Sequence, residues 1–351
     1  MIRDPLYFNR TQLAERLVDN LQSNILHAIT LFAPRRMGKT QFLDNDITQI
    51  AKEQGFSVFY YSFMDQPNQT REHFMFALAT FLAEIESPLY KKANSLTKIE
   101  LFGASLEWNV DAPPPPSSVS GYISRMAKTN KPVLMLLDEA QEMAKKSDMR
   151  DLIGSLRTGL DIHRDRVKVI FTGSSPHGLK SMFNDYKAPF FNFAHQIDFP
   201  IFGKEFTDFL ADIYEQRTGS SIDKEKFFSY FATLGHTPLF ARTMIQEMIL
   251  NPNLTLEQVF EVKLEEFTKI LERATVDMPE LTALEKIILQ LISENHKSLY
   301  SAKTRSIIAE RLGVDSVSAQ TVQGQLRKLE KKELVIKNAH GDYEPAILYD
   351  F

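Results

Sequence analysis

The sequence predicts an α/β protein whose core is a parallel sheet with helices on both faces. Short apolar runs alternate with segments of helical period through the first 200 residues, which is the pattern of β-α-β units. After residue 200 the pattern is helical, and the last 73 residues have the pattern of three helices and a hairpin. We therefore expect a sheet core over 1–200, a helical lid over 201–278 and a winged-helix domain over 279–351.

The composition limits the possible classes of protein. Of the 351 residues 43% are hydrophobic and 25% charged, as in an ordinary soluble globular protein. The net charge of −4 gives no global field for nucleic acid or membrane, so such a partner needs a local patch. The absence of cysteine excludes disulfides and thiolate chemistry and fits a reducing compartment. No signal-type segment and no run of about 20 apolar residues is present, so we expect a cytoplasmic protein without a membrane partner.

The core elements follow from the spacing of the apolar residues. Helical stripes such as Leu13, Leu17 and Leu21 alternate with continuous apolar runs, which predict buried strands. The expected order is helix 11–21, strand 25–32, helix 41–51, strand 57–63, helix 70–86, helix 117–129, strand 132–137, helix 148–163, strand 166–172 and strand 195–199.

Residues 88–116 interrupt this order. Two alternating segments around Gly103 predict a small inserted hairpin, in which Trp108 is expected to serve packing. The proline run 113–116 predicts a stiff connector, with a docking ligand as the alternative.

A loop between the first strand and its helix has the pattern of a phosphate-binding loop. Its sequence is Ala33-Pro34-Arg35-Arg36-Met37-Gly38-Lys39-Thr40, followed by Gln41. Inward backbone N–H groups at a helix N-terminus would cradle the phosphates of a nucleotide. Lys39 is expected to reach the β- and γ-phosphates, and the Thr40 hydroxyl to ligate Mg²⁺. Ala33 replaces the usual first glycine, which is tolerable where φ is below zero; the alternative is a surface turn.

Two acidic residues follow the apolar strand at 132–137. Asp138 and Glu139 stand at its C-terminal end, where open α/β sheets bind their ligands. We expect Asp138 to hold Mg²⁺ directly or through water, and Glu139 to act as general base toward the attacking water. Strand ends are often acidic, so the pair gains its significance from the phosphate loop upstream.

Other polar residues have two interpretations each. Ser174, after the strand at 166–172, either hydrogen-bonds the γ-phosphate or the water, or caps the next helix. Arg242 lies one turn into the third lid helix, which starts at Pro238, and either reaches the γ-phosphate or is a solvated surface arginine. The lid helices are expected at 204–217, 223–234, 238–250 and 256–274.

The C-terminal residues predict helices at 281–295, 301–312 and 316–332, then a hairpin turning near 341–342. The third helix carries side chains that suit DNA: Gln320, Thr321, Gln323, Gln325, Arg327 and Lys328. Residues 279–351 hold ten Lys or Arg and ten Asp or Glu, however, and DNA-binding domains are usually more basic. A domain that contacts protein or regulates the lid is therefore an equal alternative.

These motifs together resemble the AAA+-like signal-transduction ATPases called STAND proteins, and among them the archaeal-type ATPases with a C-terminal winged helix. The similar segments, spread over nearly the whole chain, are Phe8-Asn9-Arg10, residues 33–40, Asp138-Glu139-Ala140-Gln141, Phe171-Thr172-Gly173-Ser174-Ser175 and Gly235-His236-Thr237-Pro238. The resemblance implies a P-loop ATPase that uses ATP, ADP and Mg²⁺. It places Asn9 and Arg10 beside the adenine, Ser174 as the sensor residue and Pro238 in the lid motif.

The sequence departs from this family at one position. The family's Pro-Leu-Tyr-Gly-Arg, whose arginine is a candidate finger, corresponds here to Pro189-Phe190-Phe191-Asn192-Phe193. Between 173 and 200 the only permanent cations are Lys180 and Lys187. An arginine finger contributes about 10³–10⁵ in rate, so we expect slow turnover or a finger from a partner. Arg164 and Arg166 are the substitutes within this chain.

Three functions remain open from the sequence. The first is an ATP-driven switch that contacts a protein partner, or itself, through the lid or the winged helix. The second is a DNA-acting ATPase, such as a regulator of transposition or of another mobile element. The third is a scaffold that binds nucleotide without hydrolysing it.

Overall fold

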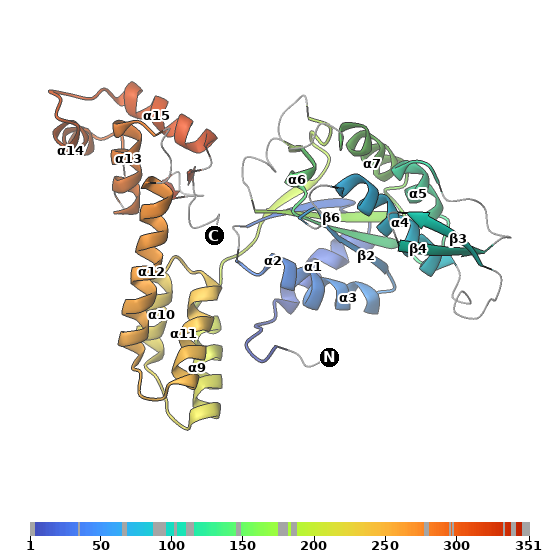
Figure 1. Ribbon diagram of the computed structural model, residues 1–351, viewed down its shortest axis with the longest axis horizontal. Helices are drawn as coiled ribbons and strands as arrows, with labels where there is room; N and C mark the ends of the chain where they lie inside the picture. The colour runs from blue at the N-terminus through green and yellow to red at the C-terminus, as the bar shows by residue number, and fades with distance from the viewer. Residues whose placement is uncertain are drawn as a thin grey trace.

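Figure 1 shows the computed structural model of the chain, in which a sheet core lies beside a column formed by the lid and the C-terminal helices. The described residues are 4–33, 36–64, 69–86, 96–101, 104–109, 116–144, 149–174, 182–183, 188–276, 281–294, 296, 298–332, 334–337 and 342–345. Several predicted features lie outside them: Pro34, Arg35, Ser175, Lys180, Lys187 and most of the proline run.

The core is an α/β arrangement built on one parallel sheet. Its strands are β1 (Ala28–Phe32), β2 (Ser57–Ser62), β5 (Val133–Asp138), β6 (Val167–Gly173) and β7 (His195–Asp198), in the order β2-β5-β6-β1-β7. Every residue of β5 and β6 is buried, because helices cover both faces of the sheet. The five strands predicted from apolar runs are thus confirmed.

Each face of the sheet packs on its own set of helices. On one face lie α1 (Thr11–Gln22), α2 (Lys39–Phe42), the π-helical segment η1 (Leu43–Ile47) and α3 (Thr48–Glu53). On the other lie α4 (Thr70–Glu86), α5 (Val119–Met126) and α7 (Arg150–Ile162), while the short α6 (Gln141–Ala144) follows β5. The predicted helix at 41–51 is continuous from α2 to α3, but it contains a π-turn that the sequence pattern did not reveal.

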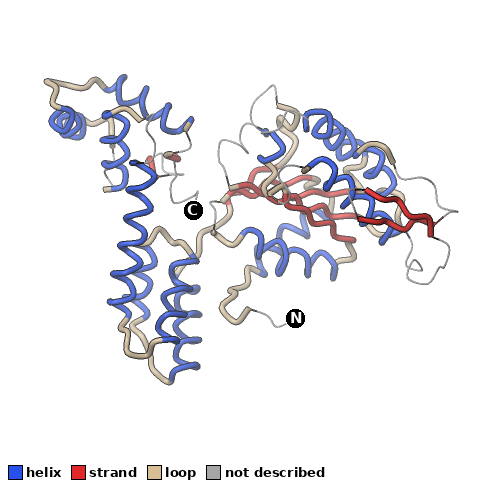
Figure 2. The backbone as a smooth tube through the Cα atoms, viewed as in Figure 1, coloured by secondary structure: helices blue, strands red, loops and turns tan. Residues whose placement is uncertain are grey.

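The predicted insertion is present as an antiparallel hairpin of β3 (Leu96–Leu101) and β4 (Ala104–Asn109). Figure 2 places it at the end of the core that is remote from the lid. It is therefore an addition to the edge of the core and lies away from the C-terminal ends of the other strands.

Four helices occupy the region predicted to be a lid and are called the lid below: α9 (Lys204–Thr218), α10 (Lys224–Thr233), α11 (Pro238–Leu250) and α12 (Leu256–Val276). They share one hydrophobic cluster, which also includes Leu6 and has Phe8 packed against it. Residues 4–10, called the N-terminal segment below, thus pack on the lid although they precede the core in the sequence. The long helix α12 continues from the lid into the C-terminal domain (Figure 1).

The C-terminal domain has the predicted order of three helices and a hairpin. Its elements are α13 (Ala283–Ser293), α14 (Ala302–Leu312), α15 (Ala319–Lys331), β8 (Val335–Lys337) and β9 (Tyr343–Pro345). Thr282, Ser301 and Ser318 cap the three helices with their hydroxyl groups, so the boundaries follow from local chemistry. The domain has its own hydrophobic cluster. In the described part of the chain, no helix has the length and apolar character that crossing a bilayer requires.

Candidate functional site

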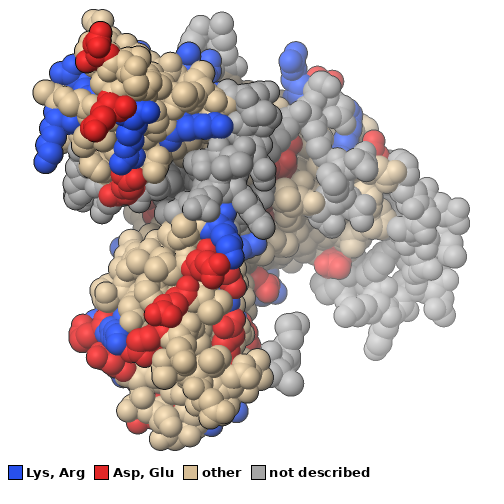
Figure 3. All heavy atoms as spheres, turned by 60° about the vertical axis from the view of Figure 1, so that its left-hand side comes forward, with Lys and Arg blue, Asp and Glu red and all other residues tan. Residues whose placement is uncertain are grey.

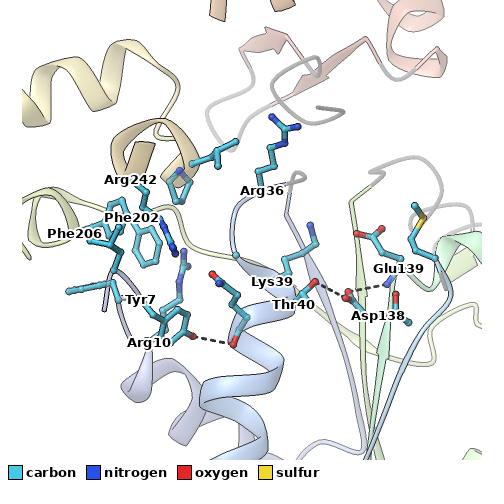
Figure 4. Close-up of a pocket in the computed structure, with 18 of the residues that line it drawn as sticks. Tyr7, Arg10, Arg36, Lys39, Thr40, Asp138, Glu139, Phe202, Phe206 and Arg242 are labelled. Carbon is cyan, nitrogen blue, oxygen red and sulfur yellow. Dashed lines mark hydrogen bonds between the residues drawn. The ribbon is translucent and has the colours of Figure 1, made fainter. Parts of the chain in front are cut away.

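A cavity of about 710 Å³ opens between the sheet core, the N-terminal segment and the lid. Figure 4 shows its two ends: Lys39, Thr40, Asp138 and Glu139 at one, and Tyr7, Arg10, Phe202, Phe206 and Arg242 at the other. One end is therefore charged and rich in oxygen, and the other is largely aromatic.

The charged end brings together the two side chains predicted to hold a metal. The Thr40 hydroxyl donates a 2.7 Å hydrogen bond to Asp138 Oδ2. Asp138 ends β5 and is 2% exposed, while Thr40 stands in the first turn of α2, directly after the loop that follows β1. The two residues meet because parallel strands bring their C-terminal ends to the same edge of the sheet.

Asp138 is the centre of a hydrogen-bond network. Its carboxylate also accepts from the Tyr60 hydroxyl at 3.2 Å, from the Thr172 hydroxyl and from the Glu139 backbone N–H at 3.1 Å. Burial, followed by the negative charge of Asp138, raises the pKa of Tyr60, so this hydroxyl stays a donor. The network holds the carboxylate in place while its Oδ2 atom faces Thr40.

The donor set at this end fits Mg²⁺. Thr40 and Asp138 offer oxygen atoms only, and Mg²⁺ in phosphate sites commonly takes one or two protein oxygens together with water and phosphate oxygens. Among the described residues there is no group of three or more His, Cys, Asp or Glu that could hold a metal by itself. A magnesium ion held by Thr40 and Asp138 would complete its coordination with water and phosphate oxygens.

The phosphate loop has the backbone that its sequence predicts at two positions. Gly38 adopts φ +85° directly before α2, a conformation that favours glycine. Ala33 does not have a positive φ, so its side chain causes no backbone strain, which explains why alanine is tolerated in place of glycine. The Lys39 ammonium donates to the Ala33 carbonyl of the same loop, and Figure 4 shows it at the charged end of the cavity. A phosphate oxygen would be a stronger acceptor for it than this neutral carbonyl.

Glu139 is held in a strained conformation beside Lys39. Its φ is +52°, which is unfavourable for a residue with a side chain. Its Oε2 accepts hydrogen bonds from the Ser174 hydroxyl at 2.7 Å, from the Ser174 N–H at 3.1 Å and from the Gln141 amide. Burial opposes ionisation of Glu139, but these bonds and the charge of Lys39 outweigh it and hold its pKa below the ordinary value. Glu139 is therefore an ionised carboxylate, as a general base must be.

Ser174 acts on Glu139 and does not line the cavity. It is 2% exposed and gives both its hydroxyl and its backbone N–H to the Glu139 carboxylate. The geometry thus favours a residue that positions the base over one that contacts the γ-phosphate. The alternative of a helix cap concerns the residues after 174, which are outside the described part.

If the chain hydrolyses ATP, as the sequence predicts, replacing Ser174 by alanine should lower the rate constant of hydrolysis about three- to tenfold, the usual value of one hydrogen bond. The KM for ATP should stay near the wild-type value, because the hydroxyl does not face the cavity. Steady-state phosphate release over a range of ATP concentrations separates the two constants. A raised KM with an unchanged rate constant would instead place Ser174 in contact with the nucleotide.

The aromatic end of the cavity is built around Arg10. Its guanidinium lies 4.0 Å from the centre of the Phe199 ring and 3.6 Å from that of Phe202. It also donates to the Pro200 carbonyl and, at 3.4 Å, to the Met37 carbonyl. Burial lowers the pKa of Arg10 to about 10. Arg10 therefore ties the N-terminal segment to the phosphate loop and to the connection between core and lid.

Two residues predicted to bind the nucleotide do not line the cavity. Asn9 is exposed to solvent. Its neighbours Phe8 and Arg10 both line the cavity, and the side chain between them points the other way. The Met37 side chain is buried in the core cluster under the loop, so only its backbone is available to a ligand. The other described residues predicted to bind nucleotide or metal do line it: Arg10, Arg36, Gly38, Lys39, Thr40, Gln41, Asp138, Pro238 and Arg242.

Arg242 is half-buried and paired with a carboxylate, so it is not a solvated surface arginine. Its guanidinium forms an ion pair with Asp4 of the N-terminal segment, with 2.6 Å between Nη2 and Oδ2. In Figure 4 it lies with Phe202 and Phe206, at the end of the cavity remote from Lys39. Contact of Arg242 with a γ-phosphate remains a prediction that requires the Asp4 pair to break.

The prediction that Arg164 or Arg166 acts as an arginine finger at the site of its own chain is wrong. Arg164 and Arg166 precede β6, whereas the site lies after the C-terminal end of this strand at Gly173. Arg166 is already bound to backbone carbonyls at that opposite edge, including those of Thr129 at 2.6 Å and Asn130 at 3.1 Å. The length of the strand separates both arginines from Glu139.

Several residues of the site were not identified from the sequence. Tyr7 and Tyr60 line the cavity, and Thr172, Gln141 and Asp46 fix its walls. Only Asp46 has a clear signal: it falls four residues after Phe42 and four before Ile50, on a stripe that is otherwise apolar. An acidic residue at a core position predicts a buried hydrogen-bond partner.

No protein-family model matches the sequence, and no curated protein is recognisably similar to it. Solved structures do share its fold. The Walker-type ATPase paby2304 of Pyrococcus abyssi is 15% identical, with 98% of this chain and 95% of that chain covered and a TM-score of 0.66. The ORC2 protein of Aeropyrum pernix, in ADPNP–ADP complexes, is 15% identical with 99% and 94% covered and a TM-score of 0.54. These similarities establish the α/β P-loop NTPase fold over nearly the full chain.

Proposed function

We propose that this protein binds and hydrolyses ATP, and that the bound nucleotide sets the arrangement of the lid and the C-terminal domain. One observation carries the proposal: Thr40 and Asp138 are hydrogen-bonded at 2.7 Å, beside Lys39 and Glu139, in a cavity with an aromatic far end. The charged end of the cavity suits a triphosphate and a metal, and the aromatic end suits a flat purine base.

The residues of the charged end have distinct roles in this reaction. Glu139 accepts the proton of the attacking water as the new bond to the γ-phosphorus forms and the bond to the β,γ-bridging oxygen breaks, with ADP as leaving group. Lys39 offsets the negative charge that gathers on the phosphate oxygens. Ser174 and Gln141 hold Glu139 in its ionised form. Mg²⁺ bound at Thr40 and Asp138 would supply further charge neutralisation.

The walls of the cavity support a switch of the STAND type. The same cavity is lined by residues of the core, of the N-terminal segment and of the lid, so a nucleotide contacts all three. Its differential affinity for arrangements of these walls would shift their populations. Because α12 continues from the lid into the C-terminal domain, a movement of the lid would reach that domain, which we propose to be a winged-helix output domain. We propose domain boundaries near residues 200 and 278.

Calorimetric titration with ATP and ADP, with and without Mg²⁺, together with phosphate release, tests the proposed function. We expect both nucleotides to bind, Mg²⁺ to strengthen ATP binding, and phosphate release to be slow without a partner or self-association. The slow rate follows from the lack of an arginine among residues 173–200. ATP binding without any hydrolysis would favour a nucleotide-bound scaffold, and a lack of binding at millimolar ATP would contradict the proposal.

A second candidate function, action on DNA, is favoured by the surface of α15. Its exposed positions are Ala319, Gln320, Thr321, Gln323, Gly324, Arg327, Lys328 and Lys331. They include no acidic side chain, although the domain as a whole is neutral. Figure 3 shows many Lys and Arg with some Asp and Glu on the C-terminal domain, and many Asp and Glu on the lid. The surface of α15 is therefore a local patch of the kind that a protein of net charge −4 requires for nucleic acid.

If α15 contacts DNA, replacing both Arg327 and Lys328 by alanine should reduce the slope of log affinity against log salt by about 2. A duplex titrated by fluorescence anisotropy at several salt concentrations measures this slope. The matched control replaces Lys52 and Lys128, two exposed lysines of the core, and should leave the slope unchanged. A wild-type protein that binds no duplex at low salt would exclude this function.

A further inference from the structure

A buried carboxylate lies outside the cavity, on the helix that starts at the phosphate loop. Asp46 is 4% exposed and belongs to η1, the π-helical segment between α2 and α3. It does not line the cavity, and neither the phosphate-binding nor the metal-binding role described above involves its side chain. Burying a carboxylate is unfavourable unless hydrogen bonds compensate for the lost water, so its partners indicate its role.

Both partners of Asp46 belong to the N-terminal segment. Asp46 Oδ2 accepts from the Tyr7 hydroxyl and, at 3.2 Å, from the Arg10 backbone N–H. The Tyr7 hydroxyl also lies 3.3 Å from the Gln41 carbonyl of α2. These contacts join residues 34 to 39 positions apart in sequence, and they fix the N-terminal segment to the helix that carries Lys39 and Thr40.

The other side of the same segment is bound to the lid. The Phe8 ring packs against Phe202, Phe206 and Phe209, with centroid distances of 5.5, 5.9 and 5.2 Å. Leu6 is buried in the lid cluster, and Asp4 pairs with Arg242. The N-terminal segment is therefore held by aromatic and ionic contacts on its lid side, and by Asp46 together with the Arg10 contacts on its core side.

We propose that Asp46 is a positioning residue for the nucleoside part of the ligand: it holds Tyr7 and Arg10 so that the N-terminal segment forms the aromatic end of the cavity. This inference rests on the proposed ATP function and specifies how the site achieves it. Asp46 acts through the aromatic end and has no contact with the charged end. Its loss should therefore weaken the binding of the nucleoside and leave the binding of the phosphates unchanged.

The experiment compares the binding of ADP with that of inorganic tripolyphosphate by calorimetry. Replacing Asp46 by asparagine should weaken ADP binding about tenfold: the asparagine oxygen can still accept, but the two hydrogen bonds to this oxygen lose the charge that strengthens them. Tripolyphosphate affinity should change less than about twofold. Asp44→Asn is the matched control, because Asp44 belongs to the same π-helical segment but is exposed, and it should alter neither affinity.

A second variant tests the same contact without changing the helix. Tyr7→Phe removes the hydroxyl that Asp46 accepts and keeps the ring, so it should weaken ADP binding selectively, as Asp46→Asn does. In the Tyr7→Phe background, Asp46→Asn should have a smaller effect than in wild type, because the shared contact is already lost. If Asp46→Asn does not fold, the affinities of Tyr7→Phe for ADP and tripolyphosphate test the proposal by themselves.

The outcomes separate this inference from the proposed function. Equal losses for ADP and tripolyphosphate, or full ADP affinity in both variants, would overturn the role of Asp46 while ATP binding by the wild type stands. A wild type that binds neither ADP nor tripolyphosphate would overturn the proposed function, and this inference with it.

Discussion

Replacing Glu139 by glutamine should lower the rate constant of ATP hydrolysis about 10²–10⁴-fold, the usual contribution of a general base. Glutamine has nearly the same shape and keeps an oxygen that can accept from Ser174, so the position of the side chain is expected to persist. It cannot take up the proton of the attacking water. Phosphate release in a single turnover, with ATP binding measured in parallel, separates a lost reaction from lost binding.

The matched control for this prediction is Glu142→Gln, which alters an acidic residue of the adjoining α6 that does not line the cavity. It should hydrolyse ATP at close to the wild-type rate. ATP binding by Glu139→Gln should remain within a few-fold of wild type, because the carboxylate repels phosphate and contributes little to affinity. Hydrolysis by Glu139→Gln at the wild-type rate would show that the base is another residue.

Replacing Lys39 by alanine should weaken ATP binding about 10- to 100-fold, the value of a hydrogen bond between charged groups, and should lower the rate constant of hydrolysis further. Lys39 is 5% exposed and lies at the charged end of the cavity, so its positive charge is weakly screened by water. The effect should decrease from ATP to ADP and vanish for adenosine, because the side chain is expected to reach only the β- and γ-phosphates.

Binding of ATP, ADP and adenosine to the Lys39 variant, measured by calorimetry, gives this series. The control is Lys52→Ala, which removes an exposed lysine from α3, the helix that continues from α2 and η1. Its affinities for ATP, ADP and adenosine should be unchanged. Equal losses for adenosine and ATP would mean that the substitution disturbs the fold of the loop. In that event the stability of the variant, measured by thermal unfolding, should be lowered as well.

The predictable part of the site is the part encoded in contiguous residues. The phosphate loop, Asp138 and Glu139 were identified because each follows an apolar strand, and a strand end is recognisable from a few neighbouring letters. The meeting of Thr40 with Asp138 follows from one rule, that parallel strands present their C-terminal ends at one edge. The positive φ of Glu139, by contrast, has no signature in its neighbours.

The sequence could not determine which way a side chain faces. Asn9 and Met37 belong to segments that reach the cavity, yet one faces solvent and the other the core. Arg164 and Arg166 are near Ser174 in sequence but at the opposite end of β6. Sequence proximity to a motif does not fix position, because a strand of seven residues spans roughly 20 Å.

The sequence by itself determined the alternation of strands and helices, the order of the elements and the phosphate-binding motif, because these depend on local periodicity and turn chemistry. Only the tertiary structure decided which distant groups meet: Asp46 with Tyr7, Arg10 with Phe202, and Asp4 with Arg242. The physical reason is that such contacts are selected by the packing of the whole lid and core. No single segment carries enough information to specify a partner that lies 39 to 238 positions away in the sequence.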